Sequence, residues 1–219
     1  RREPKRWRTK PQPESFHISI AKDEAFQFVY QDTLDFLKHQ GFSIAFFSPL
    51  HDLHLPINSD AYYFPGGYPE LYTEVLSKNR SIMKDIKKAG FAGKMIVGEC
   101  GGLMYLGKHL INETGKKITM VGVFDFATTL IAKKLTLGYR KLKPVKISNK
   151  NKKLILQGHE FHYSKFLINN ERPNWKNHQS DNKLIIKDGY NIRNCHSFYT
   201  HIYWASNKEW FNYLMESKS

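Results

Sequence analysis

The sequence lacks long apolar runs, and it has only two cysteines. No stretch of its 219 residues approaches the roughly 18 consecutive apolar residues that a membrane-spanning helix needs. Its beginning is polar and basic, without the apolar core of a secretory signal. Cys100 and Cys195 are too few for a disulfide scaffold and favour a reducing compartment. We therefore expect a cytoplasmic protein with no membrane partner.

Acidic residues are scarce relative to basic ones. The chain has 34 Lys and Arg against 20 Asp and Glu, which gives a formal net charge of +14. Such a charge suits a nucleic acid, a polyanionic small molecule or an acidic partner domain. The basic residues are scattered, however, and no aromatic–basic RNA-binding signature is present. A solvated surface is the preferred interpretation, and we do not expect a nucleic-acid partner.

The composition suits one packed domain. Hydrophobic residues make up 41% of the chain and aromatic residues 14%. Only residues 1–10 form a dense basic run, and Pro4, Pro11 and Pro13 lie in it or just after it. We expect residues 1–15 to be a basic interdomain linker or tail, and residues 16–219 to be the domain.

The first half of the domain alternates short apolar segments with amphipathic ones. Segments typical of buried strands occupy residues 16–21, 42–47, 61–64 and 94–97. Segments with helical spacing of apolar residues occupy 26–40 and 71–88, with a break expected near Asn79. This alternation predicts an α/β fold with right-handed crossovers and a parallel sheet covered by helices on both faces.

The second half has a different pattern, in which β-segments are separated by polar loops rich in Asn and Lys. The expected β-segments are residues 120–126, 135–145, 154–166, 184–187 and 195–203. The chain then ends in an amphipathic helix. These segments predict an antiparallel or mixed extension of the sheet.

The most informative stretch is KMIVGECGGLMYL, residues 94–106. A G-x-C-x-G between a strand and a helix is the thiol version of a nucleophile elbow. Its glycines permit a strained turn and leave room for a substrate carbonyl at the sulfur of Cys100. The positive end of the following helix is expected to favour the thiolate. Cys100 is the candidate nucleophile, although a lone cysteine is more often a small buried hydrophobe.

A thiol nucleophile needs a base, and two histidine clusters are candidates. His159 and His162 lie in GHEFHYS, whose composition also suits a metal site. We do not expect a metal there, because the spacing is not H-E-x-x-H and a strand would direct the two rings to opposite faces. His196 and His201 lie in HSFYTHIYW, where a structural role is the simpler alternative. Distance from Cys100 in the sequence is no objection, since folding assembles such pairs.

Backbone N–H groups complete the predicted chemistry. Gly66 and Gly67 follow a strand, as Cys100 does, so both sites belong at the carboxyl edge of the sheet. The amides of Gly67 and Gly101 are the natural donors to a tetrahedral oxyanion. Together these groups predict hydrolysis of an amide or ester through a thioester.

Several motifs carry a family resemblance. PGGYPELY (65–72), GECGGLMYLG (98–107), LGYR (137–140), GHEFHYS (158–164) and FYTHIYW (198–204) occur in this order. Together with residues 20–50, they resemble the glutamine amidotransferase domain of cobyrinate a,c-diamide synthases over about residues 16–206. Cobyric acid synthases share the elbow and the late histidine, but their counterpart of GHEFHYS differs.

The resemblance implies a flavodoxin-like, class I (triad-type) glutamine amidotransferase fold. It implies Cys100 as nucleophile, His201 as its base, and Gly66, Gly67 and Gly101 as oxyanion and substrate-binding residues. Glutamine would be hydrolysed, and its ammonia would pass to an N-terminal synthetase domain or subunit that amidates a corrinoid with ATP and Mg²⁺ in cobalamin biosynthesis. The resemblance further suggests His159 and His162 as contacts to the synthetase or the tetrapyrrole.

Two departures qualify the resemblance. Many class I amidotransferases have a glutamate two residues after the histidine, where this chain has Tyr203, so the partner that orients His201 is undefined. No G-x-x-x-x-G-K-[ST] motif is present either. We therefore expect no cofactor or metal bound by this domain, with ATP and Mg²⁺ on the synthetase. Three alternatives stay open: the same role on nickel-sirohydrochlorin, a cysteine hydrolase of similar fold, and a non-catalytic binding module.

Overall fold

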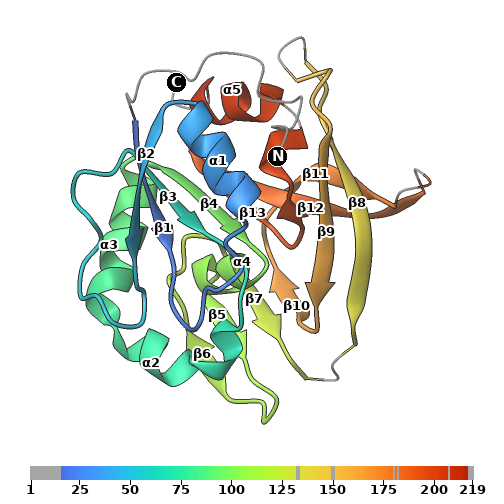
Figure 1. The fold of residues 1–219 in the computed structure, drawn as a ribbon. Coiled ribbons are helices and arrows are strands. Elements are labelled where there is room, and N and C mark those ends of the chain that lie inside the picture. Colours follow the sequence, from blue (N-terminus) through green and yellow to red (C-terminus); the bar gives the residue numbers. More distant parts are fainter. Residues whose placement is uncertain are drawn as a thin grey trace.

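The computed structural model describes residues 16–131, 134–148, 151–179, 181, 183–206 and 208–216. The predicted linker, residues 1–15, lies outside them. In the described residues, ten strands form one large sheet and four form a smaller one. Figure 1 shows helices on both faces of the large sheet. No helix in this part of the chain is long and apolar enough to cross a membrane.

One half of the large sheet is parallel, as the sequence predicts. Its strands lie side by side in the order β2 (Phe42–Phe47), β1 (Phe16–Ala21), β3 (Ala61–Phe64), β4 (Met95–Glu99) and β13 (Cys195–Phe198). The prediction assigned β13, as part of segment 195–203, to the extension, whereas it pairs in parallel with β4. Because parallel strands end at the same edge, the segments that follow β3, β4 and β13 meet there.

The other half is the predicted antiparallel extension. It continues through β12 (Leu184–Ile192), β11 (Pro173–His178), β8 (Thr136–Pro144), β9 (Leu156–His162) and β14 (His201–Ile202). The smaller sheet has the order β10 (Lys165–Asn169), β7 (Phe126–Thr129), β5 (His109–Ile111) and β6 (Lys117–Thr119). The predicted single segment 154–166 is thus divided between the two sheets.

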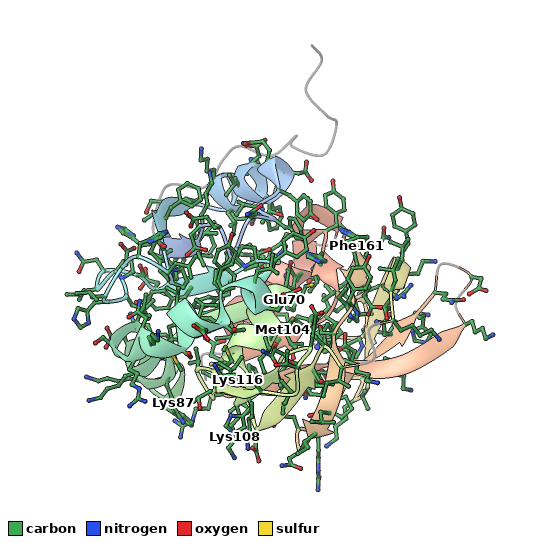
Figure 2. All side chains as sticks on the ribbon, turned by 90° about the horizontal axis from the view of Figure 1, so that it is seen from below. Glu70, Lys87, Met104, Lys108, Lys116 and Phe161 are labelled. Carbon is green, nitrogen blue, oxygen red and sulfur yellow. The ribbon has the colours of Figure 1, made fainter. Side chains whose placement is uncertain are left out.

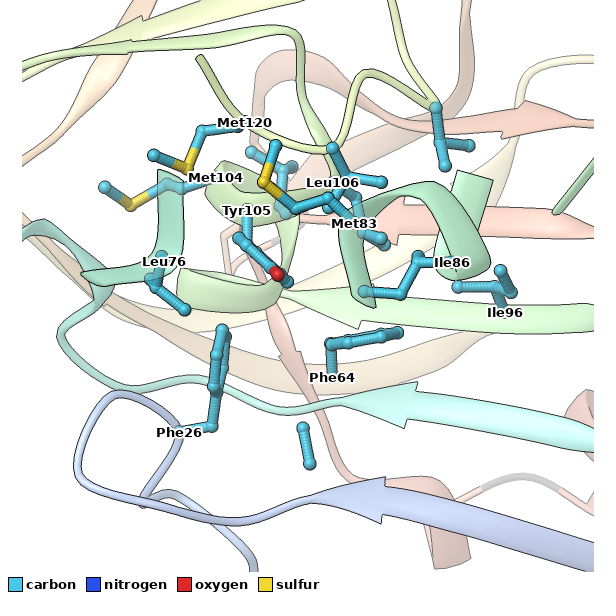
Figure 3. Packing of buried hydrophobic residues seen from close by; sticks show 14 of the residues in the cluster. Phe26, Phe64, Leu76, Met83, Ile86, Ile96, Met104, Tyr105, Leu106 and Met120 are labelled. Carbon is cyan, nitrogen blue, oxygen red and sulfur yellow. The ribbon is translucent and has the colours of Figure 1, made fainter. Parts of the chain in front are cut away.

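The helices divide between two cores, one on each face of the sheet. Helices α1 (Gln31–His39) and α5 (Lys208–Glu216) contribute Phe36, Leu37, Trp210 and Leu214 to one core. The other core contains side chains of α2 (Thr73–Lys78), α3 (Arg80–Phe91) and α4 (Gly101–Leu106). Figure 3 shows this second core, with Tyr105 and Leu106 of α4 among Phe64, Ile86 and Met83. Short 3₁₀ turns occupy Pro69–Leu71 (η2) and Trp204–Ser206 (η3).

The expected break in the second helical segment is confirmed, because α2 ends before Asn79 and α3 begins after it. The Asn79 side-chain amide donates to the carbonyl oxygens of Pro49 (3.0 Å) and Asp52 (2.8 Å). The break therefore anchors a neighbouring loop.

Two predicted elements are wrong over part of their length. The helix predicted over 26–40 begins only at Gln31, because the carboxylate of Asp23 accepts the N–H groups of Ala25 and Phe26 and holds that segment in a turn. Residues 120–125 do not form the predicted strand. The N–H groups of Val121 to Phe124 instead donate to carbonyl groups at the end of α4, which a following strand would leave unsatisfied.

Candidate active site

The elbow forms as predicted. Cys100 stands between β4 and α4 with φ 49° and ψ −102°, a conformation that costs a non-glycine residue about 1–3 kcal/mol. Its N–H donates to the carbonyl oxygen of Phe198 at 2.7 Å, which ties the turn to β13. A Cβ on Gly102 would collide with the backbone of Phe64. Glycine is therefore required for the turn to approach β3 so closely.

The predicted glycines lie together. An added Cβ on Gly101 would come within 3.0 Å of the Gly67 nitrogen and 2.8 Å of Pro69 Cδ, so the two turns lie side by side. An added Cβ on Gly66 would collide with the ring of His201. The fold thus gathers the elbow, the P-G-G turn and the late histidine, which are distant in the sequence, into one place.

His201 is enclosed by aromatic rings. It lies on β14 opposite His159 of β9, and the two imidazoles stack at 4.9 Å with an interplanar angle of 9°. The rings of Phe28 and Tyr30 lie at 5.8 and 6.4 Å. Among the described residues, neither ring nitrogen of His201 has a hydrogen-bond partner. Stacking, in place of a carboxylate, therefore fixes the plane of this imidazole.

His159 and His162 occupy different surroundings, as expected for their spacing on a strand. His159 is partly exposed and lies 3.3 Å from the Tyr30 hydroxyl. The side chain of His162 is 10% exposed and stacks on Tyr199 at 4.2 Å. Within the described residues, no group of three His, Cys, Asp or Glu side chains is arranged to hold a metal ion. Of the two, His159 is the one that a second molecule could reach.

The Cys100 thiol is covered. Its side chain is buried, and Sγ lies 3.8 Å from the carbonyl oxygen of Phe161 on β9. Figure 2 labels Phe161 of β9, and Glu70 of η2, whose charge raises the pKa of this thiol.

The structure contradicts the expected stabilisation of the thiolate. Burial raises the pKa of Cys100 well above its ordinary value, and the negative charges of Glu70, Glu99 and Glu160 raise it further. The N–H of Gly101, the first residue of α4, lowers the pKa by hydrogen bonding to the sulfur, but burial outweighs this effect. In this closed state the sulfur is a neutral thiol.

The His201 imidazole is neutral as well. Burial, together with the smaller effects of the neighbouring His159 and His162, lowers the pKa of His201 to about 3. The Cys100 thiol and the His201 imidazole are therefore both uncharged in this structure.

Glu99 is a buried carboxylic acid that sequence analysis did not single out. Its oxygens accept the Tyr63 hydroxyl at 2.9 Å and Trp204 Nε1 at 2.8 Å, and the N–H of Ile202 also donates to it. Burial raises the pKa of Glu99 to about 8, although the hydrogen bonds from these three donors lower it. Since Glu99 precedes Cys100 and Ile202 follows His201, this side chain ties the nucleophile strand to the histidine strand. Its only sequence signal was its place inside the elbow.

A cavity of about 490 Å³ opens beside His201. Its lining includes His201 but not Cys100. The other residues that matter here are Tyr30, Tyr139, Lys141, Gln157, His159 and Tyr203. Tyr203, at the position of the missing carboxylate, thus lines this cavity. His201 is thus the one proposed catalytic side chain among the residues that line this cavity.

Comparisons with known proteins agree on a family. The sequence model of the CobB/CobQ-like glutamine amidotransferase domain matches residues 17–209. A cobyrinate a,c-diamide synthase of Saccharolobus solfataricus is 40% identical over 193 residues, covering 86% of this chain and 43% of the relative. One of Synechocystis is 38% identical over 197 residues, covering 86% and 39%. The chain therefore spans about two fifths of the length of these relatives.

Solved structures show the same fold at low sequence identity. A crystal structure of a glutamine amidotransferase has a TM-score of 0.63 at 13% identity, covering 92% of this chain and 98% of that one. A glutamine amidotransferase of Thermotoga maritima has a TM-score of 0.59 at 13% identity, covering 91% and 82%. The predicted class I amidotransferase architecture is confirmed, with a mixed central sheet whose parallel half carries the elbow.

Proposed function

The chain belongs to the CobB/CobQ-like glutamine amidotransferase domain family, and from this premise we propose that Cys100 hydrolyses glutamine with His201 as its base. The observation that carries the proposal is the meeting of the strained cysteine turn, the Gly66–Gly67 turn and the His201 ring at one edge of the sheet.

In the proposed reaction, His201 takes the thiol proton as Sγ attacks the side-chain carbonyl carbon of glutamine. The N–H groups of Gly67 and Gly101 donate to the oxyanion. The C–N bond then breaks, His201 protonates the leaving nitrogen, and ammonia departs from a thioester. Water, deprotonated by the same imidazole, hydrolyses the thioester to glutamate and restores the thiol.

Glutamine must first reach the sulfur. The Phe161 carbonyl lies against Sγ, and burial keeps both the thiol and the imidazole neutral. We infer that the Phe161 carbonyl turns away from Sγ when glutamine enters, while β9 stays in place. Polar atoms then reach both groups, which lowers the pKa of Cys100 and raises the pKa of His201.

The ammonia would serve a second unit. Relatives of more than twice this length are cobyrinate a,c-diamide synthases, so we propose that an ATP- and Mg²⁺-dependent synthetase domain or subunit uses the ammonia to amidate the a and c carboxylates of cobyrinate. The same role on nickel-sirohydrochlorin is the second candidate, because the residues described so far are those of the glutamine site. Such a pathway enzyme would work in the cytoplasm.

The outer face of β8 and β9 suits this synthetase unit. Leu137 is paired with Phe161, and Tyr139 with His159, and all four side chains are at least partly exposed. Lys141 continues the row. An apolar patch of this kind beside an active site is typical of an interaction surface. We propose that the synthetase packs here, where the cavity beside His201 opens.

Cys100→Ala tests the catalytic proposal, and Cys195→Ala is its control. Both cysteines are buried and free, but Cys195 lies on β13 against Gly90. Cys100→Ala is expected to abolish glutamate release from glutamine, while Cys195→Ala retains it. Equal hydrolysis by the Cys100→Ala chain would remove the thiol from the mechanism.

A further inference from the structure

The buried carboxylate of Glu160, in the GHEFHYS motif, is held by three donors from separate parts of the fold. Arg140 Nε on β8 lies 2.8 Å from Oε2. Asn177 Nδ2 on β11 lies 2.7 Å from Oε1, and the Thr200 hydroxyl lies 3.4 Å from the same oxygen. The side chains of Glu160 and Arg140 are 7% and 6% exposed. Such a network fixes the backbone that carries it, because leaving any member unpaired inside the protein is costly.

The residues on either side of Glu160 contact the two reacting groups. His159, before it, stacks on the His201 ring. Phe161, after it, places its carbonyl oxygen 3.8 Å from Cys100 Sγ. Thr200, which donates to Glu160, immediately precedes His201. Glu160 is therefore linked to both strands, to β9 directly and to the start of β14 through Thr200.

We propose that Glu160, paired with Arg140, is a positioning residue that holds β9 and His201 in register with Cys100. The inference rests on the proposed function only in naming Cys100 and His201 as the reacting groups. Glu160 is not itself the base, because its oxygens are taken by Arg140, Asn177 and Thr200. A direct charge effect would also hinder the reaction, because a nearby carboxylate disfavours a thiolate.

The test variant is Glu160→Gln, which keeps the shape and removes the charge that Arg140 faces. Glu74→Gln is the matched control, since Glu74 pairs with Lys116 at 3.1 Å and both side chains are largely exposed. The first readout is the alkylation rate of each cysteine by iodoacetamide, followed by peptide mass mapping. We expect Cys100 to react several-fold faster in Glu160→Gln, because the Phe161 carbonyl no longer covers it, with Cys195 unchanged. The control should alter neither rate.

The second readout is glutamine turnover by the same chains. A misplacement of about 1 Å at a reacting group can lower turnover by on the order of 10²-fold. We expect a loss of this size in kcat for Glu160→Gln, with KM for glutamine little changed, because Glu160 does not touch the substrate.

A double variant separates positioning from stability. Arg140→Met combined with Glu160→Gln removes both buried charges and is expected to regain thermal stability, while kcat stays low and Cys100 stays reactive. The proposal would be overturned if kcat recovered together with thermal stability in the double variant. It would also be overturned if Glu160→Gln increased the alkylation rates of Cys100 and Cys195 equally. If the unaltered chain does not hydrolyse glutamine, the proposed function fails, and the selective reactivity of Cys100 still decides the positioning role.

Discussion

Gly66→Ala places a methyl group where the His201 ring lies. The added Cβ would overlap Cε1 of that ring, 2.8 Å from Nδ1 and 3.0 Å from Phe28 Cδ2. Real Cβ contacts are not shorter than about 3 Å, and a shift of about 1 Å at a catalytic group can cost on the order of 10² in rate. Overpacking of this kind costs about 1–3 kcal/mol in the free energy of unfolding. We therefore expect a chain that folds but hydrolyses glutamine about 10²-fold more slowly.

Gly107→Ala is the matched control. Its Cβ would lie 2.5 and 2.7 Å from two ring carbons of Phe126, a similar collision with an aromatic ring outside the proposed active site. Chemical denaturation should show comparable destabilisation of the two variants, and a coupled assay for glutamate should show a large loss only for Gly66→Ala. Equal turnover by the two variants would refute the assignment of His201 as the base.

Two further predictions concern proton chemistry. His201→Ala is expected to lower glutamine turnover by about 10²–10⁴-fold, as loss of a general base does. Steady-state kinetics at pH 8 measures the loss. A larger loss in His159→Ala would mean that His159, rather than His201, is the base. Because the pKa of Glu99 is raised from 4.5 to about 8, its contribution to stability is complete below pH 4.5 and declines as the pH rises through 8. Glu99→Gln should therefore flatten this decline, which is on the order of 5 kcal/mol between pH 4.5 and about 8 at about 1.4 kcal/mol per pH unit. Urea unfolding at pH 5 and pH 9 measures it, and an unchanged slope would contradict the shifted pKa.

The pattern of apolar residues predicted the architecture correctly where the local sequence preference matches the packing of the folded chain. Strand–helix alternation gave the parallel half, and Asn79 marked the helix break. The pattern failed at Phe26, whose helical spacing reflects burial against Phe64 and Tyr105 in a turn held by Asp23. It failed again over 120–125, where apolar residues pack under α4 as a loop.

The sequence predicted which residues meet at the site, but it did not predict their protonation states or the residues that hold them in place. Cys100, the glycines and His201 carry motif signals, and the fold brings them together. The protonation state of Cys100 was not predictable, because it depends on burial and on carboxylates from distant segments. The role of Glu160 was hidden for the same reason, since Arg140 and Thr200 reach it only through sheet pairing.

Covalent labelling with 6-diazo-5-oxonorleucine, an electrophilic glutamine analogue, tests the central claim most directly. Intact mass and peptide mapping should show a single adduct on Cys100, absent from Cys195 and blocked by excess glutamine. An adduct elsewhere, or none even when a synthetase unit is added, would contradict a glutamine site at Cys100 and favour a fold retained for binding.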